Sequence, residues 1–139
     1  MAQIVRFGVS MDAELLAAFD ALIAAKGYPN RSEAVRDMVR EAIVSRDWEQ
    51  ESSPGVAALC IVYDHDKADL PRRLARLQHH HTREITATLH VHLDEHNCLE
   101  VIILKGSPGK LRRFADQVIS ARGVKHGKLV MTTTGKHLH

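Results

Sequence analysis

The sequence is poor in aromatic residues and has no long apolar run. Aromatic side chains make up 4% of the 139 residues against 45% for all apolar types, so aliphatic side chains must build any core. No run of 18 apolar residues occurs, and the chain does not open with a basic segment followed by an apolar one. These absences argue against a transmembrane helix and a secretory leader, and they predict a soluble, cytoplasmic protein.

Cysteine is also scarce, with only Cys60 and Cys98 present. Cys60 lies in the apolar run Val56 to Tyr63, where a small buried thiol is common. A reduced compartment and a ligand role for Cys98 therefore fit better than a disulfide between the two.

No strong charge of one sign points to a partner. The net charge is +2, and residues 1–50 hold six Lys/Arg against eight Asp/Glu. DNA binding is permitted, but any contact in this part must come from local placement of charge. The one marked bias is histidine, with ten residues of this type.

The N-terminal part predicts a short strand and two helices. Residues 4–10 alternate, with Val5, Phe7 and Val9 on one face. Asp12 is a candidate helix N-cap, Gly27 a candidate C-terminal stop, and Asn30 with Glu33 resembles a capping box. Both helices carry an apolar stripe.

Two short helices and one strand cannot bury both stripes within a single chain, and a lone strand leaves its edges open. Both problems disappear if two copies intertwine as a ribbon–helix–helix dimer. Such a ribbon enters the DNA major groove and presents alternate side chains to base edges, here Arg6, Gly8 and Ser10. The alternative is a helical dimerisation arm with an incidental strand.

A polar segment, residues 49–55, ends in Ser-Ser-Pro-Gly and predicts a linker. We therefore expect a DNA-binding domain at 1–48 and a second domain at 56–139. The sequence pattern of the second domain predicts strands at 56–63, 85–93, 99–104 and 128–133 and helices at 69–81 and 108–121. This β-α-β-β-α-β order indicates a ferredoxin-like domain, and the fold class is α+β overall. Another copy of the domain should cover the bare face of the sheet.

The stretch Leu89 to Leu99 carries the clearest chemistry. His90 and His92 are two residues apart in a strand pattern, so both imidazoles face one way. Cys98 follows a polar loop, at the start of the returning strand. Imidazole and thiolate suit nickel, copper and zinc. The alternative is a half-buried strand with two hydrogen-bonded histidines and an inert cysteine.

A second group, Gln78-His79-His80-His81, closes the first helix of this domain. It is either a solvated helix end or part of a metal site. Strand rise places His79 about 15 Å or more from His90 of its own chain, so His79 would complete the site of a neighbouring chain. His65 and His126 are expected in loops, and His137 and His139 in a frayed tail. His96 is either a ligand or a solvated loop residue.

The whole chain resembles the nickel-responsive ribbon–helix–helix repressors of bacteria and archaea. Three stretches carry the resemblance, namely Gly27 to Ala34, Leu89 to Glu100 and Gly123 to Gly127. The resemblance implies an ACT-type regulatory domain that forms a homotetramer, a dimer of dimers. It implies Ni(II) bound in a plane by His90, His92 and Cys98 of one chain and His79 of another. Gln78 and Glu100 would orient the ligand imidazoles.

The same resemblance implies a second, potassium-like cation site. Its ligands would be the side chains of Glu33 and Asp37 and the carbonyls of Ile119, Ala121 and Val124. Two departures concern DNA. Gly8 stands where the family often has a polar ribbon residue, and only Lys67 remains of two basic phosphate contacts.

The resulting hypothesis is a nickel-dependent repressor of nickel uptake genes that binds palindromic operator DNA and has no membrane partner. One alternative is a metalloenzyme, but four protein ligands leave no open position for substrate. Another is an ACT-type sensor of amino acids or other small molecules, which would leave the histidine–cysteine set without a role.

Overall fold

The computed structural model describes residues 3–67 and 69–139. It divides into two compact units, one reaching to Ile43 and including Gly135–His139, the other running from Val44 to Thr134. The division falls inside helix α2 (Arg31–Gln50), which follows α1 (Ala13–Ala25). Each unit is described by itself below.

The first unit begins with an extended segment that is not a strand. Residues 3–12 hold neither strand nor helix, whereas the alternation predicts a strand at 4–10. Ile4, Val5 and Phe7 are 87%, 75% and 75% exposed. The difference has a simple cause, because a ribbon strand acquires its ladder hydrogen bonds only from a second chain.

The helix ends follow the sequence signals. Asp12 accepts hydrogen bonds from the backbone N–H groups of Glu14 (2.8 Å) and Leu15 (3.4 Å), which confirms its N-cap role. Gly27 has φ +79° just after α1, a conformation that favours glycine. Asn30 accepts from the Glu33 N–H at 2.9 Å, but the Glu33 side chain pairs with Arg36 instead of completing a capping box.

The apolar stripes of α1 and α2 remain largely uncovered in the single chain. Ile23 is buried, yet Leu15 and Val39 are 59% and 51% exposed. This agrees with the estimate that these elements cannot bury their stripes alone.

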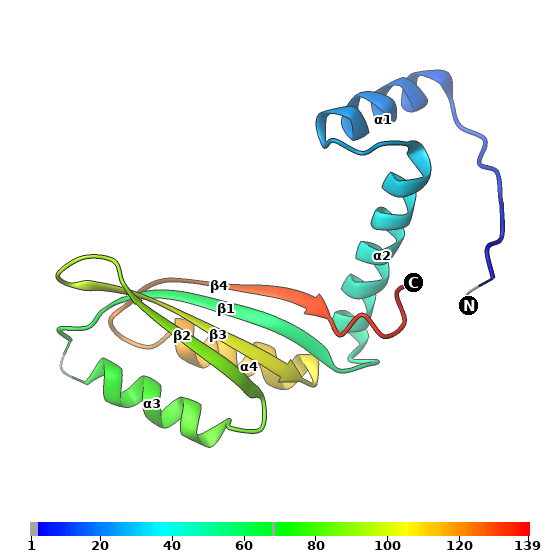
Figure 1. Ribbon diagram of the computed structural model, residues 1–139. Helices are drawn as coiled ribbons and strands as arrows, with labels where there is room; N and C mark the ends of the chain where they lie inside the picture. Colours follow the sequence, from blue (N-terminus) through cyan, green and yellow to red (C-terminus); the bar gives the residue numbers. More distant parts are fainter. Residues whose placement is uncertain (1–2, 68) are drawn as a thin grey trace. The chain divides into compact units, whose positions relative to one another are not determined.

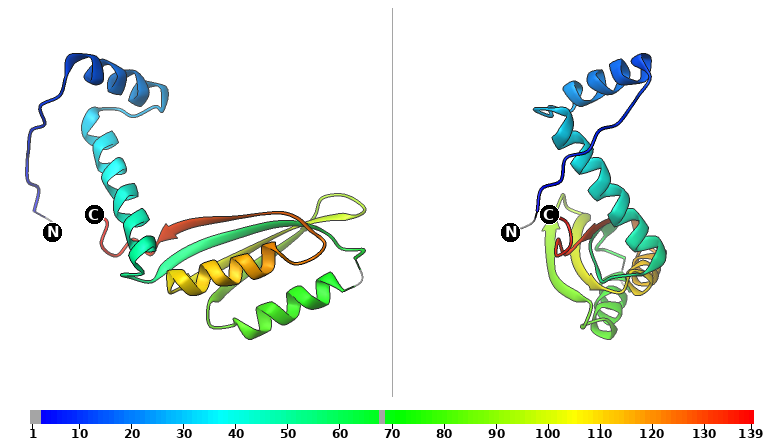
Figure 2. Two further views of the ribbon diagram at one scale, coloured as in Figure 1. Left: turned by 180° about the vertical axis from the view of Figure 1, so that it is seen from behind. Right: turned by 90° about the vertical axis from the view of Figure 1, so that its right-hand side faces the viewer.

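The second unit is a four-stranded antiparallel sheet with two helices on one face (Figure 1). The sheet order is β2-β3-β1-β4, and the left view of Figure 2 shows both helices below the sheet, on the same face. Its elements are β1 (Gly55–Asp64), α3 (Leu70–His80), β2 (Ile85–His92), β3 (Asn97–Gly106), α4 (Pro108–Ile119) and β4 (Val124–Thr133). The predicted ferredoxin-like order is confirmed.

The core lies between the sheet and α4. Burial alternates along β1 and β3, so that every second residue faces the helices. Leu59, Ile61, Ile102 and Leu104 of the sheet are buried with Leu111, Phe114 and Val118 of α4.

The last strand is longer than its sequence indicates. β4 begins at Val124 rather than Lys128, and Val124 pairs with Tyr63 across a register shift in β1. The sequence predicts a loop at His126, whereas in the structure His126 lies within β4. In the structure a Cβ on Gly127 would lie 2.5 Å from a carbon of Ile119, so glycine is needed here for close helix packing rather than for a turn.

Trp48, the single tryptophan, belongs to the second unit. It is 2% exposed, and its indole N–H donates to the Thr132 carbonyl at 2.8 Å. Only glycine fits against the ring at position 55, because a Cβ added there would lie 2.6 Å from a carbon of the Trp48 ring. The last turns of α2 are therefore packed against the sheet domain rather than left as a free helix end.

Candidate metal centre

The β2–β3 hairpin places the candidate ligands on one face. His92 lies opposite Cys98 and His90 opposite Glu100 in the antiparallel register. Opposed residues share a face of a sheet, and the His90 and His92 rings are 5.0 Å apart between centroids. This is the convergence that the i, i+2 spacing predicts. Cys98 faces the helix side of the sheet and is fully buried.

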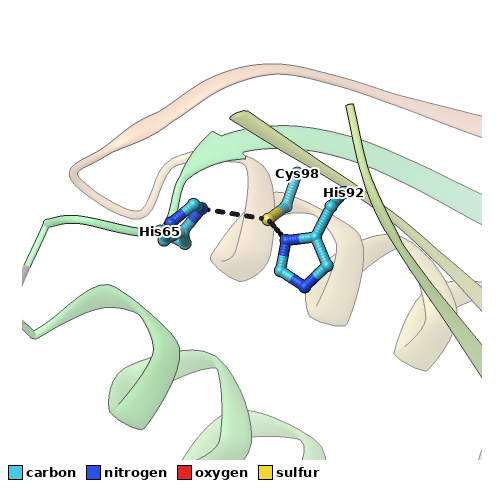
Figure 3. Close-up of side chains that lie close together, drawn as sticks. All are labelled: His65, His92 and Cys98. Carbon is cyan, nitrogen blue, oxygen red and sulfur yellow. Dashed lines mark hydrogen bonds between the residues drawn. The ribbon is translucent and has the colours of Figure 1, made fainter. Parts of the chain in front are cut away.

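The Cys98 sulfur lies between two imidazoles (Figure 3). The Sγ atom is 3.4 Å from Nδ1 of His92 and 3.3 Å from Nδ1 of His65. Both cysteines of the chain are free, and no disulfide competes for this sulfur. Cys98 is thus a buried thiol with an imidazole nitrogen on two sides.

His65 joins this group although the sequence predicts it in a loop outside the site. It follows the last residue of β1, and Asp64 pairs with Asn97 at the end of the β1–β3 ladder. The His65 N–H donates to the His96 carbonyl at 3.0 Å. The loop after β1 therefore emerges beside Cys98. Nothing in local spacing signals this, because the two residues are 33 positions apart.

His90 faces a different group of side chains. Its Nδ1 is 3.2 Å from the Tyr63 hydroxyl and 4.0 Å from Oε2 of Glu100. Glu100 is 6% exposed and accepts hydrogen bonds from the Tyr63 hydroxyl (3.3 Å) and from Nε2 of Gln78 (2.6 Å). Burial and the Glu100 carboxylate raise the pKa of Tyr63, which remains a protonated donor.

His79 lies on the outer side of α3. Leu74 is buried and Leu77, Gln78 and His81 are half-buried, whereas His79 and His80 are exposed. Successive helical residues turn by about 100°, so the inward contact of Gln78 directs the next side chain away from this hairpin. The contact of Gln78 with Glu100 also shows that the last turn of α3 lies nearer to His90 than strand rise alone suggests.

The surroundings of Cys98 favour its protonated thiol form. Burial raises the pKa of the Cys98 thiol, and the surrounding carboxylates of Asp94 and Asp66 raise it further. A metal ion must therefore displace the thiol proton when it binds. Hydrogen bonds from Asn97 lower the pKa of Asp94 to about 2, so the hairpin loop stays anionic. One buried sulfur with several imidazoles is a donor set that fits nickel, copper or zinc.

The remaining predicted site residues lie elsewhere. Arg6, Gly8 and Ser10 are exposed in the extended segment, and Lys67 lies in the loop after β1. Glu33 and Asp37 are one turn apart on α2, where they pair with Arg36 and Arg40. In the second unit the Ala121 carbonyl, near the end Ile119 of α4, accepts the Val124 N–H at 3.1 Å.

Comparison with known proteins decides the family. Residues 56–132 match the model described as NikR C terminal nickel binding domain, and residues 5–44 match ribbon-helix-helix protein, copG family. A Geobacter sp. (strain M21) protein named "Putative nickel-responsive regulator" is 54% identical over 139 residues, covering 100% of both chains. A Thermococcus onnurineus protein of the same name is 53% identical, over 98% of this chain and 99% of its own.

The chain belongs to the NikR family of nickel-responsive transcriptional regulators. The NikR family is one of DNA-binding, nickel-binding regulators and not of enzymes, which removes the metalloenzyme alternative. All the candidate nickel ligands lie within the part matched by the NikR nickel-binding domain.

A solved structure also shares part of the fold of this chain. An uncharacterised protein from Thermotoga maritima superposes with a TM-score of 0.52 at 19% identity, over 57% of this chain and 98% of its own. This likeness concerns the fold alone. Within residues 3–67 and 69–139, no helix of this NikR family member has both the length and the apolar character needed to span a membrane.

Proposed function

We propose that this regulator represses nickel uptake genes by binding a palindromic operator when Ni(II) is bound. The observation that carries the proposal is the buried Cys98 sulfur, 3.4 Å from His92 on the strand that also holds His90. A buried thiol surrounded by imidazole nitrogens provides the donor atoms of a metal site. We expect the protein to act in the cytoplasm, where its operator lies.

The proposed nickel set is His90, His92 and Cys98 of one chain with His79 of the partner subunit. His79 supports this arrangement because it is exposed and turned away from its own hairpin, while its neighbour Gln78 points inward. Nickel with nitrogen and thiolate donors favours a square-planar site, which four such ligands complete. Gln78 and Glu100 hold the buried side of the site and orient the imidazole of His90.

A homotetramer, formed as a dimer of dimers, supplies the second chain. The single chain leaves apolar side chains uncovered on edge strand β2 and in the N-terminal segment, among them Leu89 at 60% and Phe7 at 75% exposure. Exposed apolar side chains in such numbers mark interaction surfaces. Paired N-terminal segments would form the DNA-binding ribbons, and packed sheet domains would form the nickel sites.

DNA contacts are assigned to the ribbon and to one loop. Arg6, Gly8 and Ser10 alternate with the apolar residues, so a paired ribbon presents them together to base edges. Lys67 is the phosphate contact of the loop after β1. Nickel raises operator affinity by stabilising the state in which two ribbons are spaced for two half-sites.

A second, potassium-like cation belongs to the proposal. Its oxygen donors are the carboxylates of Glu33 and Asp37 and the carbonyls of Ile119, Ala121 and Val124, which suit a hard cation. The support is the family resemblance and the donor chemistry. The arginine partners of both carboxylates would have to give way or share them.

The deciding experiment measures operator binding with and without nickel for the wild type, Cys98→Ala and Cys60→Ala. Cys60→Ala is the matched control. Cys60 is the other free thiol, and it lies on the face of the sheet opposite to the one that carries Cys98. We expect nickel-dependent binding in the wild type and the control and its loss in Cys98→Ala. Nickel-dependent binding that survives Cys98→Ala would refute the proposal.

A further inference from the structure

Three donor atoms of a single chain already meet at Cys98, and one of them is absent from the proposed nickel set. The ligand atoms of His65, His92 and Cys98 all lie within 4.8 Å of one another. His90 is not part of this group among the described residues, because its Nδ1 faces Tyr63 and Glu100 instead. The fold therefore places His65, and not His90, beside the Cys98 sulfur (Figure 3).

The His65 ring is oriented as a ligand is. Its Nε2 lies 3.2 Å from Oδ1 of Asp66, while its Nδ1 faces the Cys98 sulfur at 3.3 Å. A carboxylate on one ring nitrogen places the proton there and leaves the other nitrogen free to coordinate. This carboxylate–histidine–metal relay is the usual environment of a metal-bound imidazole.

The loop that carries His65 is hydrogen-bonded to the loop of the β2–β3 hairpin. The His65 N–H donates to the His96 carbonyl at 3.0 Å, and Nδ1 of His96 lies 2.5 Å from the second oxygen of Asp66. His65 is therefore held next to Cys98 by two separate contacts. It does not approach the sulfur from a free loop.

The spacing of the donors fits a metal with three protein ligands. Bond lengths of about 2.3 Å to sulfur and about 2.0 Å to nitrogen place the two atoms about 3.1 Å apart at a right angle and about 3.5 Å apart at a tetrahedral angle. The two sulfur–nitrogen distances, 3.3 and 3.4 Å, lie within this range. An ion could enter with little movement of the donors.

We propose that His65, His92 and Cys98 form a single-chain site for divalent metals that accept tetrahedral coordination, zinc(II) or cobalt(II), with water as the fourth ligand. Zinc has no electronic preference for a plane, so it can use these donors without a second chain. The inference rests on the nickel set proposed above, with which this site shares His92 and Cys98. The two sites therefore exclude one another.

The consequence is discrimination between metals. Nickel reaches its planar set only by recruiting His79 of the partner subunit, which joins two chains. An ion bound through His65 takes all its protein ligands from one chain, so it does not connect two chains. Ions that do not prefer square-planar coordination would thus bind through His65, and their binding would leave the packing of chains unchanged.

The test is a cobalt(II) chloride titration of the full-length, metal-free protein, followed through the thiolate-to-cobalt charge-transfer band and the intense visible bands of tetrahedral cobalt. Wild type, His65→Gln, His90→Gln and Cys98→Ala are compared, with His126→Gln, an exposed histidine of β4, as the matched control. The charge-transfer band excludes ions bound by surface histidines, because these lack a thiolate. A parallel nickel titration records the planar nickel–thiolate band.

We expect His65→Gln to lose the tetrahedral bands and to weaken cobalt binding at least about tenfold, while the planar nickel band remains. His90→Gln should do the reverse, Cys98→Ala should lose both, and His126→Gln should change neither. Adding nickel to the cobalt-loaded wild type should displace the cobalt ion for ion. Asp66→Asn should weaken cobalt binding less than His65→Gln does.

Three outcomes would overturn the inference: cobalt spectra that ignore His65→Gln, cobalt bands that disappear in His90→Gln, or simultaneous binding of both metals in one chain. Failure of the proposed function is recognisable separately, as a wild type without a planar nickel band. In that case the cobalt arm still decides the role of His65. Circular dichroism of each variant confirms that it is folded.

Discussion

Gln78 on α3 donates a hydrogen bond to the buried carboxylate of Glu100 on β3, with 2.6 Å between Nε2 and Oε1. Glu100 is the strand neighbour of His90, so this bond connects the histidine-rich end of α3 to the metal hairpin. A change in the position of Gln78 should therefore also move Glu100, which lies opposite His90.

Gln78→Ala should destabilise the metal-free protein by about 1–3 kcal/mol, because a buried carboxylate loses one of its two donors. Nickel affinity should fall about 10- to 100-fold, the usual effect of removing a group that orients a ligand. Urea unfolding and nickel competition with a chelator measure the two effects. Gln117→Ala, on the exposed side of α4, is the control and should change neither. Equal behaviour of the two variants would contradict the role given to Gln78.

Mixing two defective chains should restore nickel binding. His79→Ala and Cys98→Ala should each lack complete planar sites. In a mixed oligomer, the His79→Ala chain keeps His90, His92 and Cys98, and the Cys98→Ala chain supplies the missing His79. One intact site per mixed pair should therefore return the planar absorption band. If exchange of subunits is demonstrated and no band returns, the site is built within one chain and the tetramer proposal fails with it.

Arg6→Ala should remove operator preference. Arg6 is exposed in the N-terminal segment, and a bidentate arginine–guanine contact is worth about 1–3 kcal/mol of discrimination. Competition between operator and random DNA measures this preference in the presence of nickel. Arg113→Ala, an exposed arginine on α4, controls for the loss of one positive charge. Nickel affinity should be unchanged in both variants, and equal preference in both would exclude Arg6 from base recognition.

The contact between Asp20 and Arg31 should make the first unit sensitive to acid. Nε and Nη2 of Arg31 each donate to one oxygen of the Asp20 carboxylate at 2.8 Å, and this hydrogen bonding lowers the pKa of Asp20 below 3.8. Because the folded pKa is depressed, the stabilisation is present above pH 3.8 and is lost as the pH falls through the lowered value. NMR titration of the Asp20 carboxyl group should show the depressed pKa in the wild type and an ordinary one in Arg31→Gln. An ordinary pKa in both would mean that the contact is absent in solution.

Much of this protein follows from its sequence because the signals are local. Asp12 caps α1 through N–H groups two and three residues away, and the period-2 spacing of His90 and His92 places both rings on one face of β2. The order of strands and helices in the second unit follows in the same way from changes in hydrophobic period. Such features depend on residues a few positions apart, which sequence displays directly.

Only the tertiary structure decided which distant residues meet. His65 reaches Cys98 because β1 ends beside the start of β3, and Gln78 reaches Glu100 because α3 packs beneath the sheet. The early start of β4 depends likewise on Gly127 lying against Ile119. The N-terminal segment shows the opposite limit, since its alternation predicts a strand whose hydrogen-bond partner lies outside the single chain. Local pattern determines what an element is, whereas packing determines what it touches, because contacts across a fold depend on chain paths that no spacing encodes.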